Sequence, residues 1–130
     1  MVTTLHLRPS ELQEQAALVR ILRKSKLLFA AVPNGGYRLS REARNMRMSG
    51  VQAGVPDILV FDRPAGASGG LPAGLAIEMK RVGGTPCNVT PEQRRWLAEL
   101  RQRGWLTIVA FGVNHAVEQM KGLGYELKGA

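Results

Sequence analysis

Two carboxylates and one ammonium group stand at spacings that could hold a metal ion. Asp57 precedes the β-branched and aromatic run 58–61, and Glu78 and Lys80 lie at the end of the apolar run 75–80. Because successive side chains of a strand alternate between its two faces, Glu78 and Lys80 point the same way. A hairpin formed by the two runs brings Asp57 to the same end of the sheet.

Such a cluster suits a divalent metal ion. Two carboxylates held close together repel each other, and a cation between them removes that repulsion. Mg²⁺ and Mn²⁺ favour oxygen ligands and keep waters for chemistry. The metal lowers the pKa of a bound water, and Lys80 beside it can orient or help deprotonate that water. The structural alternative is that Asp57 is a turn residue and that Glu78 and Lys80 form a solvated pair.

The first half of the chain predicts a helix, a strand and a basic segment. Ser10 and Gln13 form a capping-box pattern ahead of a helix that continues to about Lys24. The run 27–32 predicts a buried strand, because it is short and apolar and a Pro-Asn-Gly-Gly turn follows it. Residues 37–50 carry many basic and few apolar side chains, which predicts a loop or a short exposed helix.

The second half predicts a long-looped antiparallel hairpin, 57–62 with 75–80, and then a helix, a strand and a helix. The first of these helices begins at the capping box Thr90-Pro91-Glu92-Gln93. Strand 105–111 follows, and Asn114 is expected to cap the final helix. The helix that begins at this capping box is expected to face the core with an apolar stripe formed by Trp96, Leu97 and Leu100.

The order of these elements defines the expected fold. We expect an α/β protein with a small mixed β-sheet flanked by helices and containing one βαβ crossover. The 130 residues suit one domain, with its core over about 10–122.

The composition favours a polyanionic partner. Lys and Arg number 18 against 10 Asp and Glu, a formal net charge of +8, and such an excess favours nucleic acid. No stretch of about twenty residues lacks charge, so no membrane span is expected. The N-terminal sequence lacks a signal-peptide core, and the single cysteine excludes an internal disulfide, so a cytosolic location is expected.

Several short motifs, in this order, resemble one nuclease family. Pro56-Asp57 with Glu78-Met79-Lys80 resembles the PD-(D/E)XK pattern of metal-dependent nucleases. The ordered set, from about Glu11 to Val113, resembles the VRR-NUC (virus-type replication-repair nuclease) branch. Its motifs are Asn34-Gly35-Gly36, Gly54-Val55-Pro56-Asp57-Ile58, Ala76-Ile77-Glu78-Met79-Lys80 and Thr90-Pro91-Glu92-Gln93, followed by Gly104.

The resemblance implies a restriction-endonuclease-like core that hydrolyses phosphodiester bonds in DNA with Mg²⁺ or Mn²⁺. It also implies that a glutamate of the first helix joins Asp57 and Glu78 at the metal. Glu14 matches that position best, and Glu11, about one turn earlier, is the rival. The alternative for either acid is placement in the first turn, which the helix dipole favours. The backbone carbonyl of Met79 is a further metal ligand by the same resemblance.

Two further sets of residues are expected near DNA. Gln93 matches a family glutamine at the active site, and its capping-box role is a competing interpretation because one side chain can hardly serve both. Glycines permit close approach of the backbone to DNA, although the glycines here could instead form an ordinary turn. Arginines contact phosphates, although these arginines could instead form a solvated face. The candidate DNA contacts are Asn34, Gly35, Arg38, Arg41, Arg44, Arg47 and Arg81.

The resemblance also carries expectations about the substrate. Stand-alone members are often phage-encoded, and they are expected to be homodimers that cut branched DNA such as four-way junctions in the cytosol of a bacterial or phage-infected host. A flap- or nick-directed repair nuclease is the alternative within this class. An RNA-directed or end-trimming nuclease is not separated from these by the sequence. A non-catalytic DNA-binding module is disfavoured, because Asp57, Glu78 and Lys80 are all present.

Overall fold

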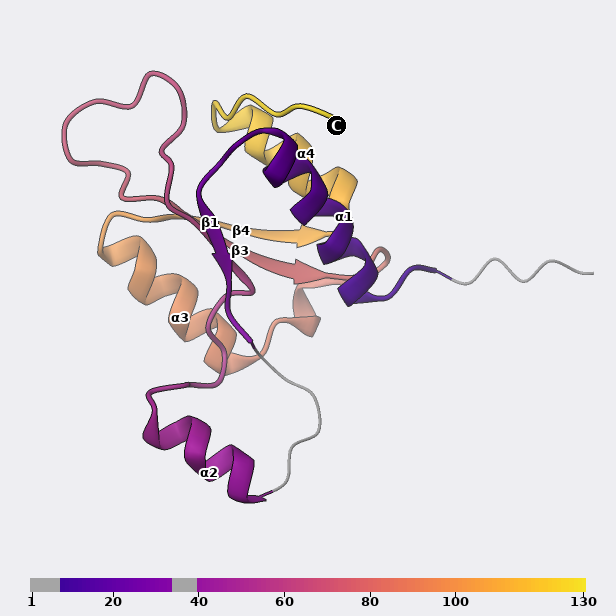
Figure 1. Ribbon diagram of the computed structural model, residues 1–130, viewed down its shortest axis with the longest axis vertical. Coiled ribbons are helices and arrows are strands. Elements are labelled where there is room, and N and C mark those ends of the chain that lie inside the picture. The colour runs from indigo at the N-terminus through magenta and orange to yellow at the C-terminus, as the bar shows by residue number, and fades with distance from the viewer. Residues whose placement is uncertain (1–7, 34–39) are drawn as a thin grey trace, which may run out of the picture.

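A mixed four-stranded β-sheet with helices on both faces forms the body of the protein (Figure 1). The computed structural model describes residues 8–33 and 40–130, so the candidate DNA contacts Asn34, Gly35 and Arg38 lie outside the described residues. The strands are β1 (Phe29–Ala31), β2 (Ile58–Val60), β3 (Leu75–Lys80) and β4 (Leu106–Phe111). The helices are α1 (Glu11–Lys24), α2 (Ser40–Met48), α3 (Pro91–Gln102) and α4 (Val113–Gly122).

The pairing of the strands confirms the predicted α/β fold. The sheet order is β1-β2-β3-β4, in which β1 and β2, and β2 and β3, are antiparallel. The predicted hairpin is present, with Ile58 opposite Ile77. Strands β3 and β4 are parallel, with Ile77 beside Ile108, so α3 is the crossover between them.

The hydrophobic core lies between one face of the sheet and the helices α1 and α4. Leu18 and Leu22 are one turn apart on α1 and are fully buried, as are Ile77 of β3 and Met120 of α4. Alternation along β3 sends Leu75, Ile77 and Met79 to this face and Glu78 and Lys80 to the opposite face. Helix α3 packs on the opposite face, which explains why all six β3 residues are buried although two are charged.

Strand β1 is less buried than the run 27–32 predicted. It lies at the edge of the sheet and pairs with β2 alone, and both Ala30 and Ala31 are exposed. Helix α3 packs on β3 and β4, so it leaves the β1 end of its face of the sheet uncovered. The prediction of a strand in this run was therefore confirmed, but the prediction that the strand is buried was wrong. An apolar run alone does not show how far a helix extends over a sheet.

Two of the three predicted helix caps are present. Ser10 and Gln13 close the capping box of α1, and the Thr90-Pro91-Glu92-Gln93 box opens α3. The third prediction was wrong, because α4 begins at Val113 with Gly112 as its N-cap, and Asn114 lies within the helix. Gly112 has no side chain with which to cap, and its φ of 98° suits glycine. The free N–H groups of α4 therefore need an acceptor from elsewhere in the chain.

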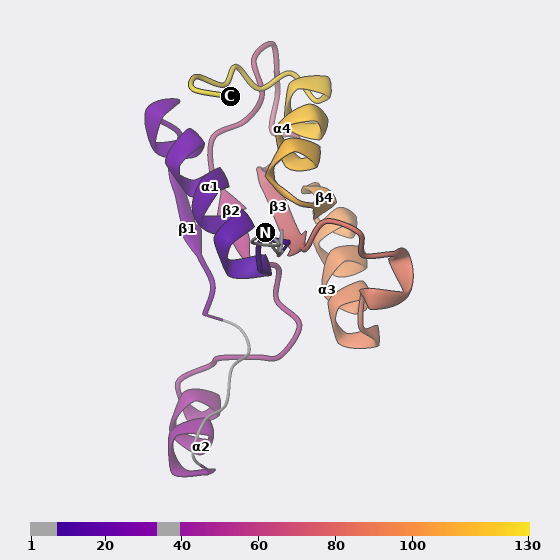
Figure 2. The ribbon, with the colours of Figure 1, turned by 90° about the vertical axis from the view of Figure 1, so that its right-hand side faces the viewer.

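Helix α2 stands away from the sheet, below it in both views (Figures 1 and 2). It confirms the short exposed helix that was one of the two predictions for residues 37–50. Its arginines Arg41, Arg44 and Arg47 are exposed, and the loop that returns from it enters β2 through Gly54. Among the described residues no other helix or strand packs closely on α2, so the basic helix is free to contact a partner.

Candidate active site

The β2–β3 hairpin places Asp57 directly opposite Glu78. The strands are antiparallel and Ile58 pairs with Ile77, so Asp57, which precedes Ile58, lies across from Glu78, which follows Ile77. A hydrogen bond joins the carboxyl groups of Asp57 and Glu78, and Asp57 Oδ2 also accepts the Met79 N–H at 2.7 Å. The hairpin therefore holds the two acids side by side at one end of the sheet.

Glu78 is buried in a way that favours its protonated form. Only 2% of the residue is exposed, and this burial raises its pKa to about 9. The hydrogen bond to Asp57 and the negative charges of Asp57 and Glu11 act in the same direction, while the positive charge of Lys80 opposes them. At neutral pH, without a cation beside it, the Glu78 carboxyl keeps its proton.

Lys80 and Gln93 form the next part of the cluster. Lys80 is 7% exposed, and its Nζ donates to Gln93 Oε1 at 2.9 Å. The same oxygen accepts the Thr90 N–H at 2.9 Å. The capping box of α3 therefore does not exclude a contact between Gln93 and Lys80, because one carbonyl oxygen has two lone pairs. The N-terminal turn of α3 thereby holds the Lys80 ammonium in place.

Glu11 and Glu14 of α1 face different surroundings. A pocket of about 360 Å³ is lined by residues that include Glu11, Asp57, Glu78 and Gln93. Glu14 does not line this pocket. It is buried at 7% exposure, and its Oε2 accepts the Val113 N–H at 2.9 Å, which supplies the missing cap of α4. The geometry thus favours the rival Glu11 over Glu14 as the acid of α1 that accompanies Asp57 and Glu78.

This difference predicts separate effects of Glu11→Ala and Glu14→Ala. Glu14→Ala is expected to lower the free energy of unfolding by about 1 kcal/mol, because it removes a helix cap. Glu11→Ala is expected to leave stability within about 0.5 kcal/mol, as for other surface changes, and to slow cleavage at least tenfold. Urea unfolding and DNA cleavage rates of both variants test this. Normal cleavage by Glu11→Ala, with a folded Glu14→Ala that cannot cleave, would reverse the assignment.

Gly54 brings the loop before β2 against the start of α3. Its φ is 88°, and a Cβ at this position would lie 2.7 Å from the backbone carbon of Glu92. Only glycine permits so close an approach at this φ without strain. The contact forms the wall of the pocket between Asp57 and α3, which gives a structural reason for the glycine of the Gly54-Val55-Pro56-Asp57-Ile58 motif.

A second, polar pocket of about 230 Å³ lies beside the first. Its lining includes Glu11, Lys80, Arg81 and Gly83, so it shares two residues with the cluster around Glu78. Arg81 is exposed there. Of the predicted DNA contacts in the described part of the chain, Arg81 alone is at the candidate active site, and the other three stand on α2.

The pair Asp57 and Glu78 fits a divalent metal ion, although no larger ligand cluster surrounds it. Within residues 8–33 and 40–130, no three His, Cys, Asp or Glu side chains form a group that could hold a metal. Mg²⁺ needs fewer, because it is bound through one or two carboxylates and keeps several waters. Glu78 Oε1 is buried without a hydrogen-bond partner among the described residues. A buried oxygen without a partner beside a second carboxylate is what a bound cation would satisfy.

Comparison with known protein families matches residues 9–114 to the VRR-NUC domain. The chain belongs to the VRR-NUC family. A solved structure described as a VRR_NUC domain protein is similar over 90% of this chain and 89% of that chain, with a TM-score of 0.66 and 21% sequence identity. At this identity the likeness confirms the fold alone. A comparison with curated proteins finds no match.

Membership of the VRR-NUC family implies a nuclease that binds DNA and uses a divalent metal ion. The site described above lies within the matched residues. Among the described residues, no helix is long and apolar enough to span a bilayer. Sequence reasoning did not find the hydrogen bond from the Met79 N–H to Asp57, and no residue pattern signals it because it depends on the strand register.

Proposed function

We propose that this VRR-NUC domain is a Mg²⁺- or Mn²⁺-dependent DNA endonuclease with Asp57, Glu78, Lys80 and Glu11 at its active site. The observation that carries the proposal is the hydrogen-bonded carboxyl pair of half-buried Asp57 and buried Glu78. One Glu78 oxygen has no hydrogen-bond partner among the described residues, and Lys80 lies on the same strand face. Two carboxyl groups this close repel each other when both are ionised, and a cation between them removes that repulsion, so the pair supports a cation site.

Each residue has a distinct role in the proposed reaction. Asp57 and Glu78 would hold the cation, the Met79 carbonyl is a further candidate ligand, and Glu11 lines the same pocket beside them. The bound ion supplies a positive charge that stabilises the phosphate in the transition state and lowers the pKa of the attacking water. Lys80 is positioned by Gln93 to donate a hydrogen bond to that water or to a phosphate oxygen. The 3′ oxygen is the leaving group.

The basic surface supports DNA as the substrate. The net charge is +8, and Arg81 lies at the active site while three arginines stand exposed on α2. Phosphate contacts of this kind supply affinity that does not depend on base sequence. We infer that branched DNA, such as a four-way junction, is the preferred structure and that a homodimer presents two sites for paired cuts.

An activity assay tests the proposed function. End-labelled linear duplex, flap and four-way-junction DNA are incubated with the protein in Mg²⁺, Mn²⁺ or EDTA. We expect cleavage in Mg²⁺ or Mn²⁺, with the branched substrates cut fastest, and no cleavage in EDTA. A preparation that cuts none of these DNAs, or that cuts equally well in EDTA, would overturn the proposal. Gel filtration with light scattering tests the dimer.

A further inference from the structure

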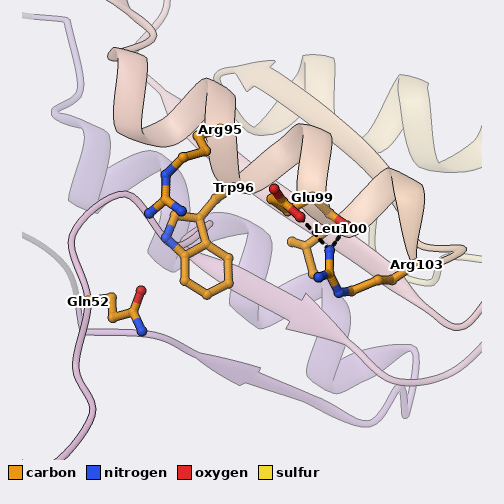
Figure 3. A pocket seen from close by; sticks show the side chains of 6 residues that line it. All are labelled: Gln52, Arg95, Trp96, Glu99, Leu100 and Arg103. Atoms are coloured by element: carbon orange, nitrogen blue, oxygen red, sulfur yellow. Dashed lines mark hydrogen bonds and ion pairs between the residues drawn. The ribbon is translucent and has the colours of Figure 1, made fainter.

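A groove of about 390 Å³ lies along α3 on the side that faces the uncovered end of the sheet (Figure 3). In Figure 3 the ring of Trp96 projects from α3 toward the chain that carries Gln52, with Arg95 and Arg103 at the two ends of the row. Trp96 and Leu100 were expected in the core, but both are only half-buried because they line this groove. The residues lining the α3 groove are Gln52, Arg95, Trp96, Glu99, Leu100 and Arg103.

The α3 groove contains a donor without an acceptor. Trp96 Nε1 is buried and makes no hydrogen bond within residues 8–33 and 40–130. Most buried polar atoms of native proteins have a partner, and each exception asks for an explanation such as a ligand. The indole also offers an aromatic surface on which a nucleobase can stack.

Of the two arginines that line the α3 groove, one has a charged partner and the other has none within the part of the chain that the structure describes. Arg103 donates to the backbone oxygen of Glu99 and pairs with its carboxylate, so these two charges neutralise each other. Arg95 is exposed and makes neither a hydrogen bond nor an ion pair with the described residues. One guanidinium beside an aromatic ring suits a nucleotide, which has a phosphate at one end and a base at the other.

The α3 groove is continuous with the candidate active site. Gln52 lines the groove, and the next two residues, Ala53 and Gly54, line the pocket that contains Asp57. On the other wall, Gln93 and Trp96 are three residues apart on α3, which is roughly 4.5 Å along the helix axis. In duplex DNA, successive nucleotides of one strand rise by about 3.4 Å along the helix axis. The two distances are similar, so a nucleotide next to the cleaved phosphodiester can reach the groove.

We propose that the α3 groove binds an unpaired nucleotide of the DNA strand whose phosphodiester lies at the active site. The base packs against Trp96 and Leu100, an acceptor atom of the base or sugar takes the Trp96 N–H, and Arg95 contacts a phosphate. This inference rests on the proposed function and narrows its branched substrates to those with an unpaired segment, such as a flap or a junction with unpaired nucleotides at its branch point. A protein partner is less suited to the groove, because an apolar face would leave the Nε1 donor and Arg95 unsatisfied.

Trp96 fluorescence tests the proposal without requiring catalysis. The chain has two tryptophans, so Trp105→Phe leaves Trp96 as the single tryptophan, which is excited selectively at the red edge of the absorption band. This variant is titrated in EDTA with a duplex carrying a short unpaired extension and with a blunt duplex of equal length. We expect the extended duplex to quench Trp96 emission and to bind about tenfold tighter, a factor within the range of base–aromatic stacking. Equal binding of both DNAs without quenching would overturn the inference.

Substitutions in the groove give a second measurement. Trp96→Leu and Arg95→Gln are each expected to weaken binding of the extended duplex about tenfold and binding of the blunt duplex less than twofold. The matched control is Arg101→Gln, the same charge change on α3 outside the groove, where the arginine contacts Thr107. If Trp96→Leu instead dissolves a dimer and leaves DNA preference unchanged, the groove binds a second copy and the proposal is wrong.

Failure of the further inference is distinguishable from failure of the proposed function. Equal binding of both duplexes by the wild type, with cleavage of branched DNA by Trp96→Leu and Arg95→Gln at the wild-type rate, would remove the nucleotide site and leave the nuclease intact. Binding that prefers the extended duplex by a protein that never cuts would keep the groove and remove the nuclease. Because binding is measured in EDTA, the two outcomes do not depend on each other.

Discussion

Asp57→Asn is expected to slow DNA cleavage about a thousandfold while the protein stays folded. The substitution removes one negative charge from the pair that would hold the metal ion. Its amide oxygen can still accept the Met79 N–H that Asp57 accepts at 2.7 Å. A thousandfold loss corresponds to about 4 kcal/mol of transition-state stabilisation, since each factor of ten is about 1.4 kcal/mol. Single-turnover cleavage at saturating Mn²⁺ measures it.

The matched control for this substitution is Asp62→Asn. Asp62 follows β2 at its other end, and its Oδ2 accepts the Leu28 N–H at 2.6 Å, so it makes the same kind of backbone contact away from the pocket. We expect Asp62→Asn to cleave at the wild-type rate. A loss of similar size in both variants would mean that the backbone contacts matter rather than the Asp57 charge, and it would count against the metal site.

Glu78→Gln is expected to stabilise the metal-free protein at neutral and higher pH and to abolish cleavage. The pKa of Glu78 is raised to about 9, chiefly by burial. Between its ordinary value of 4.5 and about 9, the unfolded chain has lost this proton and the folded protein retains it. The free energy of unfolding therefore falls as pH rises through this window. Glutamine removes that dependence and imitates the protonated acid.

Thermal unfolding in EDTA between pH 5 and pH 8.5 measures this effect. The Tm of Glu78→Gln minus that of the wild type is expected to grow as pH rises. Glu118→Gln is the control, because Glu118 is exposed on α4 and makes no hydrogen bond or ion pair with the described residues. A Tm difference that stays constant across this pH range would contradict the burial of a protonated Glu78.

Much of the fold and the main acids of the site follow from local patterns. Capping boxes located the starts of α1 and α3, and the apolar runs located β2 and β3. Strand alternation then put Glu78 and Lys80 on one face. The register of the hairpin, which a long connection leaves open in the sequence, was needed to show that Asp57 stands opposite Glu78.

The choice between Glu11 and Glu14 could not be made from the sequence. Both acids lie in the first turn of α1, three residues apart, so their helix faces are close. Their surroundings differ because α4 packs beside α1 and begins with Gly112, which has no side chain to cap it. That tertiary contact draws the Glu14 carboxylate to Val113, and it is not encoded in the spacing of either acid.

The α3 groove could not be predicted from the sequence for a similar reason. An apolar stripe on a helix predicts burial, and Leu97 is buried at 4% exposure as expected. The stripe of α3 is wider than the part of the sheet beneath it, so Trp96 and Leu100 extend beyond the core. The width of the sheet under a helix is set by strand order, which a helical pattern does not contain.

The most direct test of the central claim is a calorimetric titration of Mn²⁺ into the wild type, Asp57→Asn and Asp62→Asn. The claim is that Asp57 and Glu78 together hold the catalytic metal ion. We predict that the wild type and Asp62→Asn bind Mn²⁺ with the same affinity and that Asp57→Asn binds at least tenfold more weakly. Equal affinity of Asp57→Asn and the wild type, or no binding by the wild type, would contradict the claim.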